Sequence, residues 1–438
     1  MFLKNKTRIY TAKQGPVGVG LIGAGKFGSM FLSQVPSSTD IRVDAIADLN
    51  PDNVNSRLSE LGWPSELSKT TYLTNNVEEL LTRPGVDVVV EATGDPIAGI
   101  VHAKKAIAHG KHVVMVNVEA DALAGPALAS LARKAGVVYS MAYGDQPALT
   151  CEMIDWAINC GFEVVAAGKG TKYLPAYHQS TPDTVWQHYG LTADQAAAAG
   201  MNSKMFNSFL DGTKSAIEMC AIANATQLDI ADSGLSFPPC GADELANVLK
   251  PIEDGGQLER SGLVEVVSSL NRDASVVERD LRWGVYVVIK APNDYSANCF
   301  TQYGMNVDSS GRYSAMYKPF HLIGLELNIS ILSACVLGEA TGSCQRFAAD
   351  VATVTKTALA AGTELDGEGG FSVFGKAVPA GYSLKNQCLP IGLAQGARLK
   401  RDIAAGEEIC YQDVEVDLTH EAIVLRKSME IQYLEKFS

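Results

Sequence analysis

The stretch Val17–Met30, VGVGLIGAGKFGSM, decides the fold of this chain. An apolar run leads straight into the pattern G-x-G-x-x-G, and a helix-like segment follows it. In that setting the first glycine permits a tight turn, the second lets the backbone approach a pyrophosphate, and the third lets helix and strand pack closely. The helix N-terminus also presents its N–H groups to the phosphates. The stretch therefore predicts a dinucleotide-binding loop made of Gly23, Ala24, Gly25, Lys26, Phe27 and Gly28.

An acidic residue follows the next strand-like run, IRVDAIADLNP, about 20 residues after the last glycine of the loop. This residue, Asp48, is placed to bond an adenosine ribose hydroxyl, which favours NAD because a carboxylate repels the 2′-phosphate of NADP. The other interpretation is that Asp48 turns away or caps the next segment, while Lys26, Asn50 or Arg57 meets the phosphate.

Strand-like and helix-like segments alternate up to about residue 140. Residues 86–90, 111–116 and 137–140 are apolar runs typical of buried parallel strands, and helical segments separate them. The pattern predicts a doubly wound parallel sheet in a nucleotide-binding domain over residues 1–150. Ligands of such sheets lie at the carboxyl ends of the strands. The candidates for contacts with the cofactor, unless they are only turn residues, are Thr93, Gly94, Asn117, Val118 and Glu119.

The composition limits the partners of the chain. Its 438 residues suggest two or three domains, and a net charge of −13 argues against nucleic-acid binding. Nine cysteines without a C-x-x-C pair are typical of reduced thiols in a cytoplasmic protein. The N-terminus has no apolar signal region. The apolar segment 322–337 is short for a membrane span, so we expect a buried helix there and no membrane association.

The alternation ends near residue 150, and residues 151–345 read as an α+β catalytic domain. Residues 162–172 predict a strand that ends in a Gly/Lys loop carrying Lys169 and Lys172. Helical spacing then places Lys214 and Glu218 on one face, either as functional groups or as a simple surface pair. A polar, cationic cluster precedes that helix and is able to bind phosphate: Asn202, Ser203, Lys204 and Ser208.

Later segments suggest a further anion site and a third domain. A turn-rich stretch brings Tyr317, Lys318 and His321 near the expected start of the apolar helix, although a lone histidine is as often structural. Beyond residue 345 the composition changes, and residues 362–370 read as a loop. Residues 389–416 read as short strands and turns, which predicts a small all-β domain over 346–438.

Several motifs resemble known families. The nucleotide-binding domain, with Asp211-Gly-Thr-Lys214 opening a helix, resembles the homoserine dehydrogenase group. The segment 397–407 followed by Asp413-Val414 resembles a SAF domain, a small β-clip module. Together with YKPFHLIGLE at 317–326, these features resemble SAF-containing oxidoreductases related to homoserine dehydrogenase. Among them the layout is most similar to the 1-deoxy-D-xylulose 5-phosphate reductoisomerase-like (DRL) enzymes of bacterial isoprenoid synthesis.

The resemblance implies an NADPH-dependent conversion of 1-deoxy-D-xylulose 5-phosphate to 2-C-methyl-D-erythritol 4-phosphate. A C–C bond of the ketose phosphate is broken and remade, and the resulting aldehyde is reduced. Lys169, Lys172 or Lys214 would then polarise oxygens, and the clusters above would hold the phosphate. Asp145 and Glu218 are candidate catalytic residues and candidate ligands of Mg²⁺ or Mn²⁺, although they form no tight acidic motif.

Two other functions remain open at this stage. One is a dehydrogenase of homoserine or of a sugar acid that leaves the carbon skeleton intact, with Lys169 or Lys214 as acid or base. The other is a nucleotide-sensing protein that binds carbohydrate through the SAF-like module. By analogy with other Rossmann proteins we expect a homo-oligomer.

Overall fold

The computed structural model describes residues 2–437 and divides the chain into two compact units. Unit 1 holds the chain up to Cys151, residues 321–345 and the chain from His420 onward. Unit 2 holds residues 152–320 and 346–419. The first boundary lies close to the expected end of the nucleotide-binding domain. The rest differs from three consecutive domains, because both units are built from separate stretches of sequence.

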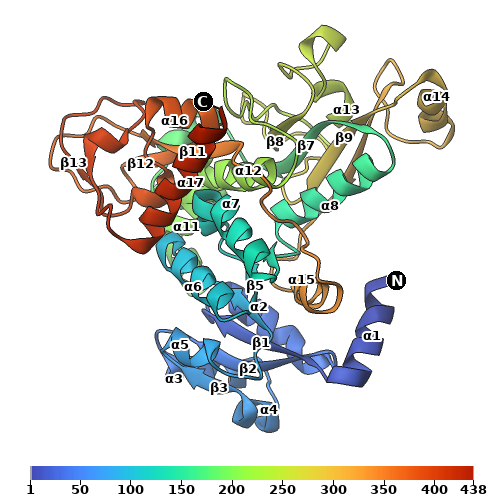
Figure 1. Ribbon diagram of the computed structural model, residues 1–438. Helices are drawn as coiled ribbons and strands as arrows, with labels where there is room; N and C mark the ends of the chain where they lie inside the picture. The colour runs from blue at the N-terminus through green and yellow to red at the C-terminus, as the bar shows by residue number, and fades with distance from the viewer. Residues whose placement is uncertain (1, 438) are drawn as a thin grey trace. The chain divides into compact units, whose positions relative to one another are not determined.

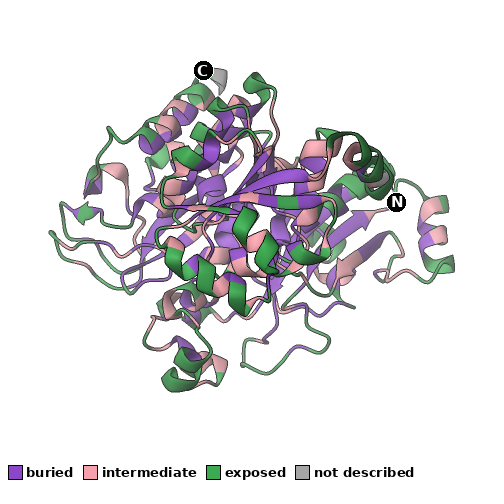
Figure 2. Cartoon of the chain, turned by 90° about the horizontal axis from the view of Figure 1, so that it is seen from below, coloured by how far each residue is buried: buried purple, intermediate pink, exposed green. Residues whose placement is uncertain are grey.

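Unit 1 contains the expected parallel sheet, in the order β3-β2-β1-β4-β5-β6. Every strand pair in it is parallel. The central strands are buried on both faces, as their near-continuous apolar runs require. Figure 2 shows such strands in purple, with exposed residues mainly on helices and loops. The strands are β1 (Val17–Ile22), β2 (Ile41–Ala47), β3 (Tyr72–Thr74), β4 (Val88–Glu91), β5 (His112–Met115) and β6 (Tyr139–Met141).

The helices of unit 1 begin at clear local signals. Asn50 caps α3 by accepting from the Asn53 N–H, with Pro51 in the first turn. Asp95 caps α6 in the same way. The helices are α1 (Phe2–Gln14), α2 (Lys26–Gln34), η1 (Val35–Ser37), α3 (Pro51–Glu60), α4 (Ser65–Thr70), α5 (Val77–Leu81), α6 (Pro96–Ala108), α7 (Val118–Ala135), α15 (Asn328–Leu332), η4 (Ser333–Leu337) and α17 (Glu421–Phe437).

Two of these helices differ from expectation. The single apolar helix expected over 322–337 is instead a turn, the short α15 and one π-helical turn that ends at Gly338. The C-terminal helix α17 lies in unit 1, where it packs against α6 and α7 (Figure 1), rather than in the C-terminal β domain. Arg426 explains this, because its fully buried guanidinium donates to the Leu123 carbonyl at 2.9 Å and to Glu430 at 2.7 Å.

Unit 2 is built on a mixed sheet in the order β10-β9-β7-β8, in which only β7 and β8 are parallel. The expected Gly/Lys loop at residues 168–172 is instead the end of a strand. Gly168 and Gly170 allow neighbouring backbone segments to approach β7 closely. An added Cβ at these positions would collide with the carbonyl oxygens of Glu265 and Leu281, respectively. The strands are β7 (Glu163–Thr171), β8 (Leu263–Ser268), β9 (Val285–Lys290) and β10 (Tyr313–Lys318).

Helix α12 is the centre of unit 2. It packs on β7 and β8, and also on the C-terminal strands β11 (Ala349–Thr355) and β12 (Val373–Pro379), as Figure 1 shows, so the β part shares the core of this unit. The helices of unit 2 are η2 (Pro175–Gln179), α9 (Val185–Tyr189), α10 (Ala193–Ala198), α11 (Ser203–Leu210), α12 (Thr213–Ala225), α13 (Leu245–Val248), η3 (Ile252–Asp254) and α14 (Asp294–Gln302), with α8 (Gln146–Asn159) crossing the unit boundary.

The C-terminal part has the expected short strands and turns in two antiparallel sheets, and Gly406 lies in a turn with φ +77°. These elements agree with a small, mainly β module. It comprises β11 (Ala349–Thr355), β12 (Val373–Pro379), α16 (Ala380–Asn386), η5 (Ile391–Leu393), β13 (Arg398–Leu399), η6 (Tyr411–Asp413) and β14 (Val414–Glu415).

Candidate functional site

The glycine loop between β1 and α2 has the geometry of a phosphate cradle. Gly23 has φ +91°, and a Cβ there would lie 2.8 Å from the Ala92 carbonyl oxygen. A Cβ on Gly28 would lie 2.6 Å from the Gly23 carbonyl oxygen, whereas Gly25 faces open space. Gly25 is the N-cap of α2 and has no side chain that could occupy the first N–H groups of the helix. The loop is therefore open where a pyrophosphate would bind.

Asp48 is tied to this loop. Its Oδ2 accepts from the Ala24 N–H at 2.9 Å, and its Oδ1 accepts from the Asn50 N–H at 3.0 Å. The Arg57 guanidinium donates to the carbonyl of Ala24. A positive and a negative side chain thus bind the same turn. Sequence reasoning named both residues, but only the structure shows that they share one partner.

Glu91 is a buried carboxylate at the end of β4 that sequence reasoning missed. Its Oε1 accepts from the Thr93 hydroxyl at 2.6 Å and lies 3.1 Å from His102 Nδ1. Its Oε2 is buried without a hydrogen-bond partner in the described residues. An acid that ends an otherwise apolar run was the available signal. Glu91 holds the Thr93 hydroxyl at the sheet edge where cofactors of this fold lie.

The expected cofactor residues after β5 open α7. Asn117 caps this helix, since its Oδ1 accepts from the Ala120 N–H at 3.1 Å. Its Nδ2 donates to the Asp95 carbonyl at 2.7 Å and links the ends of β4 and β5. Val118 and Glu119 lie in the first turn of α7, and Gly94 has φ +74° in the loop before α6. These residues border the carboxyl edge of the sheet, as predicted.

The turn at residues 322–326 borders the same edge, which the sequence did not reveal. A Cβ on Gly144 would lie 2.8 Å from the Leu322 carbonyl oxygen, and one on Gly324 would lie 3.1 Å from the Phe27 carbonyl oxygen. The turn therefore packs on both the start of α2 and the turn after β6. Asp145, in the latter turn, is 7% exposed and accepts from the N–H of the next residue at 2.9 Å.

In unit 2 the structure joins two of the predicted catalytic residues. Lys169 on β7 forms an ion pair with Glu218 on α12, and the side chains are only 7% and 4% exposed. Helical spacing had placed Lys214 and Glu218 on one face, as functional groups or as a simple surface pair. Glu218 faces the sheet, however, whereas Lys214 is only half-buried. The result is a buried proton donor and acceptor in direct contact, a pair able to act on a carbonyl and a hydroxyl.

The polar cluster expected to hold phosphate is used by the chain itself. Asn202 caps α11, and Lys204 donates to the Asp366 carbonyl and, at 2.7 Å, to Gln395 Oε1. Ser208 donates to the carboxylate of Glu368. Ser203 is the first residue of α11. Lys204 and Ser208 thus fasten loop 362–370 to α11, which is a structural role.

Lys172 lies just beyond β7, where it donates to the carbonyl of His188. Burial, followed by the nearby Arg282 guanidinium, lowers the pKa of Lys172. The same Arg282 lies 5.5 Å from the ring centre of Tyr189, and burial raises the pKa of Tyr189 to about 12. The sequence did not indicate that Arg282 lies near Lys172, because the two residues are far apart in the chain.

Tyr317, Lys318 and His321 do not crowd the start of a helix. The first two lie at the half-buried end of β10, which pairs with β9. Tyr317 accepts from Arg279 at 2.9 Å, and Lys318 lies 5.9 Å from the ring centre of Phe320. His321 opens the next segment of unit 1.

Asp211, the first residue of the motif Asp211-Gly-Thr-Lys214, has a structural role. Lys356 donates to Asp211 Oδ2 and to the carbonyls of Ser180 and Gly370, each at 2.8 Å, and the charged pair is almost completely buried. Burial raises the pKa of Asp211, although Lys356 opposes this effect. His178, whose pKa burial lowers, contacts the Asp211 carbonyl at 2.7 Å. This cluster joins the β part to α12.

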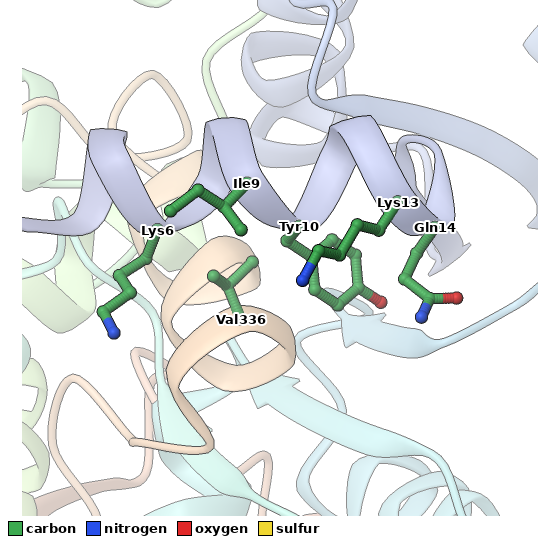
Figure 3. Close-up of a pocket in the computed structure, with 6 residues that line it drawn as sticks. All are labelled: Lys6, Ile9, Tyr10, Lys13, Gln14 and Val336. Atoms are coloured by element: carbon green, nitrogen blue, oxygen red, sulfur yellow. The ribbon is translucent and has the colours of Figure 1, made fainter.

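Three further observations limit the site. Within residues 2–437 no three His, Cys, Asp or Glu side chains form a group that could hold a metal ion, so the Mg²⁺ or Mn²⁺ site at Asp145 and Glu218 gains no support. No helix of the described chain has the length and apolarity needed to cross a membrane. A surface pocket of about 420 Å³ lies beside α1 (Figure 3), and its lining of Lys6, Ile9, Tyr10, Lys13, Gln14 and Val336 includes none of the expected site residues.

Two family models match the chain. Residues 18–141 match "Homoserine dehydrogenase, NAD binding domain", and residues 144–327 match "Oxidoreductase DRL, catalytic domain". Homoserine dehydrogenase from Mycobacterium leprae is 34% identical over 124 residues, which are 28% of this chain and 27% of that protein. The Mycobacterium tuberculosis H37Rv enzyme is 34% identical over 125 residues, with the same coverage. The chain thus spans about a quarter of the length of these relatives.

Solved structures share less with the chain. KijD10, a 3-ketoreductase from Actinomadura kijaniata solved with NADP, is 19% identical, with a TM-score of 0.25 over 36% of this chain and 49% of that one. Biliverdin reductase from Synechocystis is 19% identical, with a TM-score of 0.27 over 40% and 57%. These scores are too low to carry an argument. The two family matches support an NAD(P)-dependent oxidoreductase of the DRL and homoserine dehydrogenase-like group.

Proposed function

We propose that this chain is an NADPH-dependent reductoisomerase that converts 1-deoxy-D-xylulose 5-phosphate to 2-C-methyl-D-erythritol 4-phosphate. The observation that carries the proposal is the buried Lys169–Glu218 pair, which lies within the segment that matches the DRL catalytic model. A rearrangement of this kind needs an acid at a carbonyl oxygen and a base at a hydroxyl, held away from water. The pair provides both groups in contact.

The roles of the two residues follow from their chemistry. The Glu218 carboxylate takes the proton of the reacting hydroxyl while one C–C bond breaks and another forms. The Lys169 ammonium donates to the carbonyl oxygen that gains charge, and a proton passed back between the two restores the pair. A nicotinamide, when bound, would supply the hydride for the resulting aldehyde, and a proton from solvent would complete the new hydroxyl. Burial strengthens each of these interactions because the local dielectric constant is low.

The glycine loop is the proposed site of the cofactor pyrophosphate. Asp48 by itself favours NAD, but Arg57 on the same turn supplies a positive charge that offsets repulsion of a 2′-phosphate. NADPH is therefore the proposed cofactor. If NADH supports the faster reaction at equal concentration, this part of the proposal is wrong.

The experiment is product analysis with the purified full chain, NADPH and 1-deoxy-D-xylulose 5-phosphate. The expected product has a branched skeleton by NMR, and Lys169→Met lowers kcat at least 100-fold. Lys376→Met is the matched control, because that lysine pairs with Glu408 in the same unit at 2.9 Å and is 43% exposed. The control is expected to retain activity within a factor of two.

A second candidate is a dehydrogenase that leaves the skeleton intact, favoured by the homoserine dehydrogenase match of the nucleotide-binding part. A straight-chain product, or turnover of homoserine in place of the ketose phosphate, would establish this alternative. Nucleotide binding without turnover of either substrate would favour a nucleotide-sensing role instead.

A further inference from the structure

Lys172 and Arg282 bring two positive charges to one edge of the unit 2 sheet. Lys172 follows the carboxyl end of β7, and Arg282 precedes the amino end of β9. The two strands are antiparallel, with Lys169 opposite Val285, so these two ends meet. Gly170 permits the approach, since a Cβ there would collide with the carbonyl of Leu281.

The two charges lack a compensating carboxylate. Lys172 donates to a backbone carbonyl, that of His188, and Arg282 lies over the rings of Trp283 and Tyr189, at 4.7 and 5.5 Å from their centres. Within residues 2–437 neither side chain forms an ion pair. Like charges so placed destabilise one another unless an anion lies between them. Burial and the Arg282 charge together lower the pKa of Lys172, which agrees with repulsion between the two cations.

Other buried or partly buried lysines of unit 2 are already satisfied. Lys356 has Asp211, Lys169 has Glu218, and Lys204 holds the loop that precedes β12. A lysine that already has such partners is a weaker candidate for binding a ligand, because binding would have to break existing contacts. The pair Lys172 and Arg282 is therefore the stronger candidate for an external anion.

We propose that Lys172 and Arg282, beside the ring of Tyr189, form the subsite that binds the phosphate monoester of the substrate. The planar guanidinium offers two parallel donors to phosphate oxygens, and the ammonium adds a point charge. The identity of the substrate rests on the proposed function, but the anion site does not. Lys172 follows Lys169 by three residues, about 10 Å along a strand.

The test is calorimetric titration of the full chain with inorganic phosphate, in the absence of cofactor and sugar. We expect one binding site, weakened at least tenfold in Arg282→Gln and less in Arg282→Lys, which retains the charge but loses the fork. The control is Arg398→Gln, because that exposed arginine of the same unit pairs with Glu364. Circular dichroism and the urea midpoint check that each variant is folded.

The outcomes separate this inference from the proposed function. Unchanged phosphate affinity in both Arg282 variants, equal loss in the Arg398 control, or tighter binding of acetate than of phosphate would overturn the site. If phosphate binds as expected but the ketose phosphate is not converted, the site stands and the reductoisomerase proposal fails. If conversion occurs with an unchanged KM for the ketose phosphate in Arg282→Gln, the reaction stands and the site fails.

Discussion

Asp121→Asn is expected to remove a pH-dependent loss of stability from unit 1. Asp121 lies on α7 and is 1% exposed. Tyr139 donates its hydroxyl to Oδ1 at 2.8 Å, and Cys344 donates its thiol to Oδ2 at 3.4 Å. Burial raises the pKa of Asp121 to about 6, and these two hydrogen bonds offset only part of that effect.

The sign and size of the effect follow from linkage. The folded-state pKa of about 6 exceeds the ordinary value of 3.8, so the native state binds more protons than the unfolded state between these pH values. The contribution of this group is fully present below pH 4 and is lost as the pH rises through 6. The difference of about 2.2 pKa units corresponds to about 3 kcal/mol. Asparagine cannot ionise, so the variant avoids this loss at neutral pH.

The assay is urea unfolding of the wild type and the variant at pH 4 and pH 7. The free energy of unfolding of Asp121→Asn, relative to wild type, is expected to rise by about 2–3 kcal/mol between these values. Asp52→Asn, an exposed substitution in the first turn of α3, is the control and is expected to show a much smaller change. Parallel pH profiles for wild type and Asp121→Asn would refute the argument that this carboxyl is buried and costly to ionise.

Two further predictions concern buried charges. Lys356→Met leaves the buried Asp211 carboxylate without its cation, and urea unfolding is expected to show a free energy of unfolding lower by about 3–5 kcal/mol. Adding Asp211→Asn is expected to recover part of this loss. A loss below about 1 kcal/mol would contradict a stabilising role for Lys356. Arg426→Met removes the donor to the Leu123 carbonyl and is expected to cost about 2 kcal/mol and lower the Tm, whereas the exposed Lys385→Met is expected to change neither. An unchanged Tm in Arg426→Met would mean that α17 adds little to unit 1.

Local patterns were sufficient for the nucleotide-binding sheet. The buried runs that become β1 and β4, the caps at Asn50 and Asp95, and the glycine loop depend on residues close in sequence. The position of Asp48 directly after β2 is also local, because the length of the strand sets that spacing. Backbone stereochemistry and strand burial act within a few residues, so a sequence pattern records them.

Partners far apart in sequence were not predictable in this way. Helical spacing placed Glu218 on the same face as Lys214. In the structure, however, Glu218 lies on the helix face that packs on β7, and it forms an ion pair with Lys169. Lys204 was expected to bind the phosphate of a ligand, but it donates instead to the Asp366 carbonyl in a loop that is distant in sequence. Arg282 carried no signal at all, since only the antiparallel pairing of β9 with β7 brings it near Lys172.

By itself the sequence determined the parallel sheet, the dinucleotide loop and the short-stranded C-terminal part, because propensity, caps and glycine turns are local properties. The tertiary structure alone decided that the chain returns to unit 1 with α17, and which lysines are satisfied internally. The reason is physical: a buried charge must find its partner across the fold, and packing between distant segments settles which partner that is. Lys169 and Lys172 look alike in sequence, and their surroundings in unit 2 give them different roles.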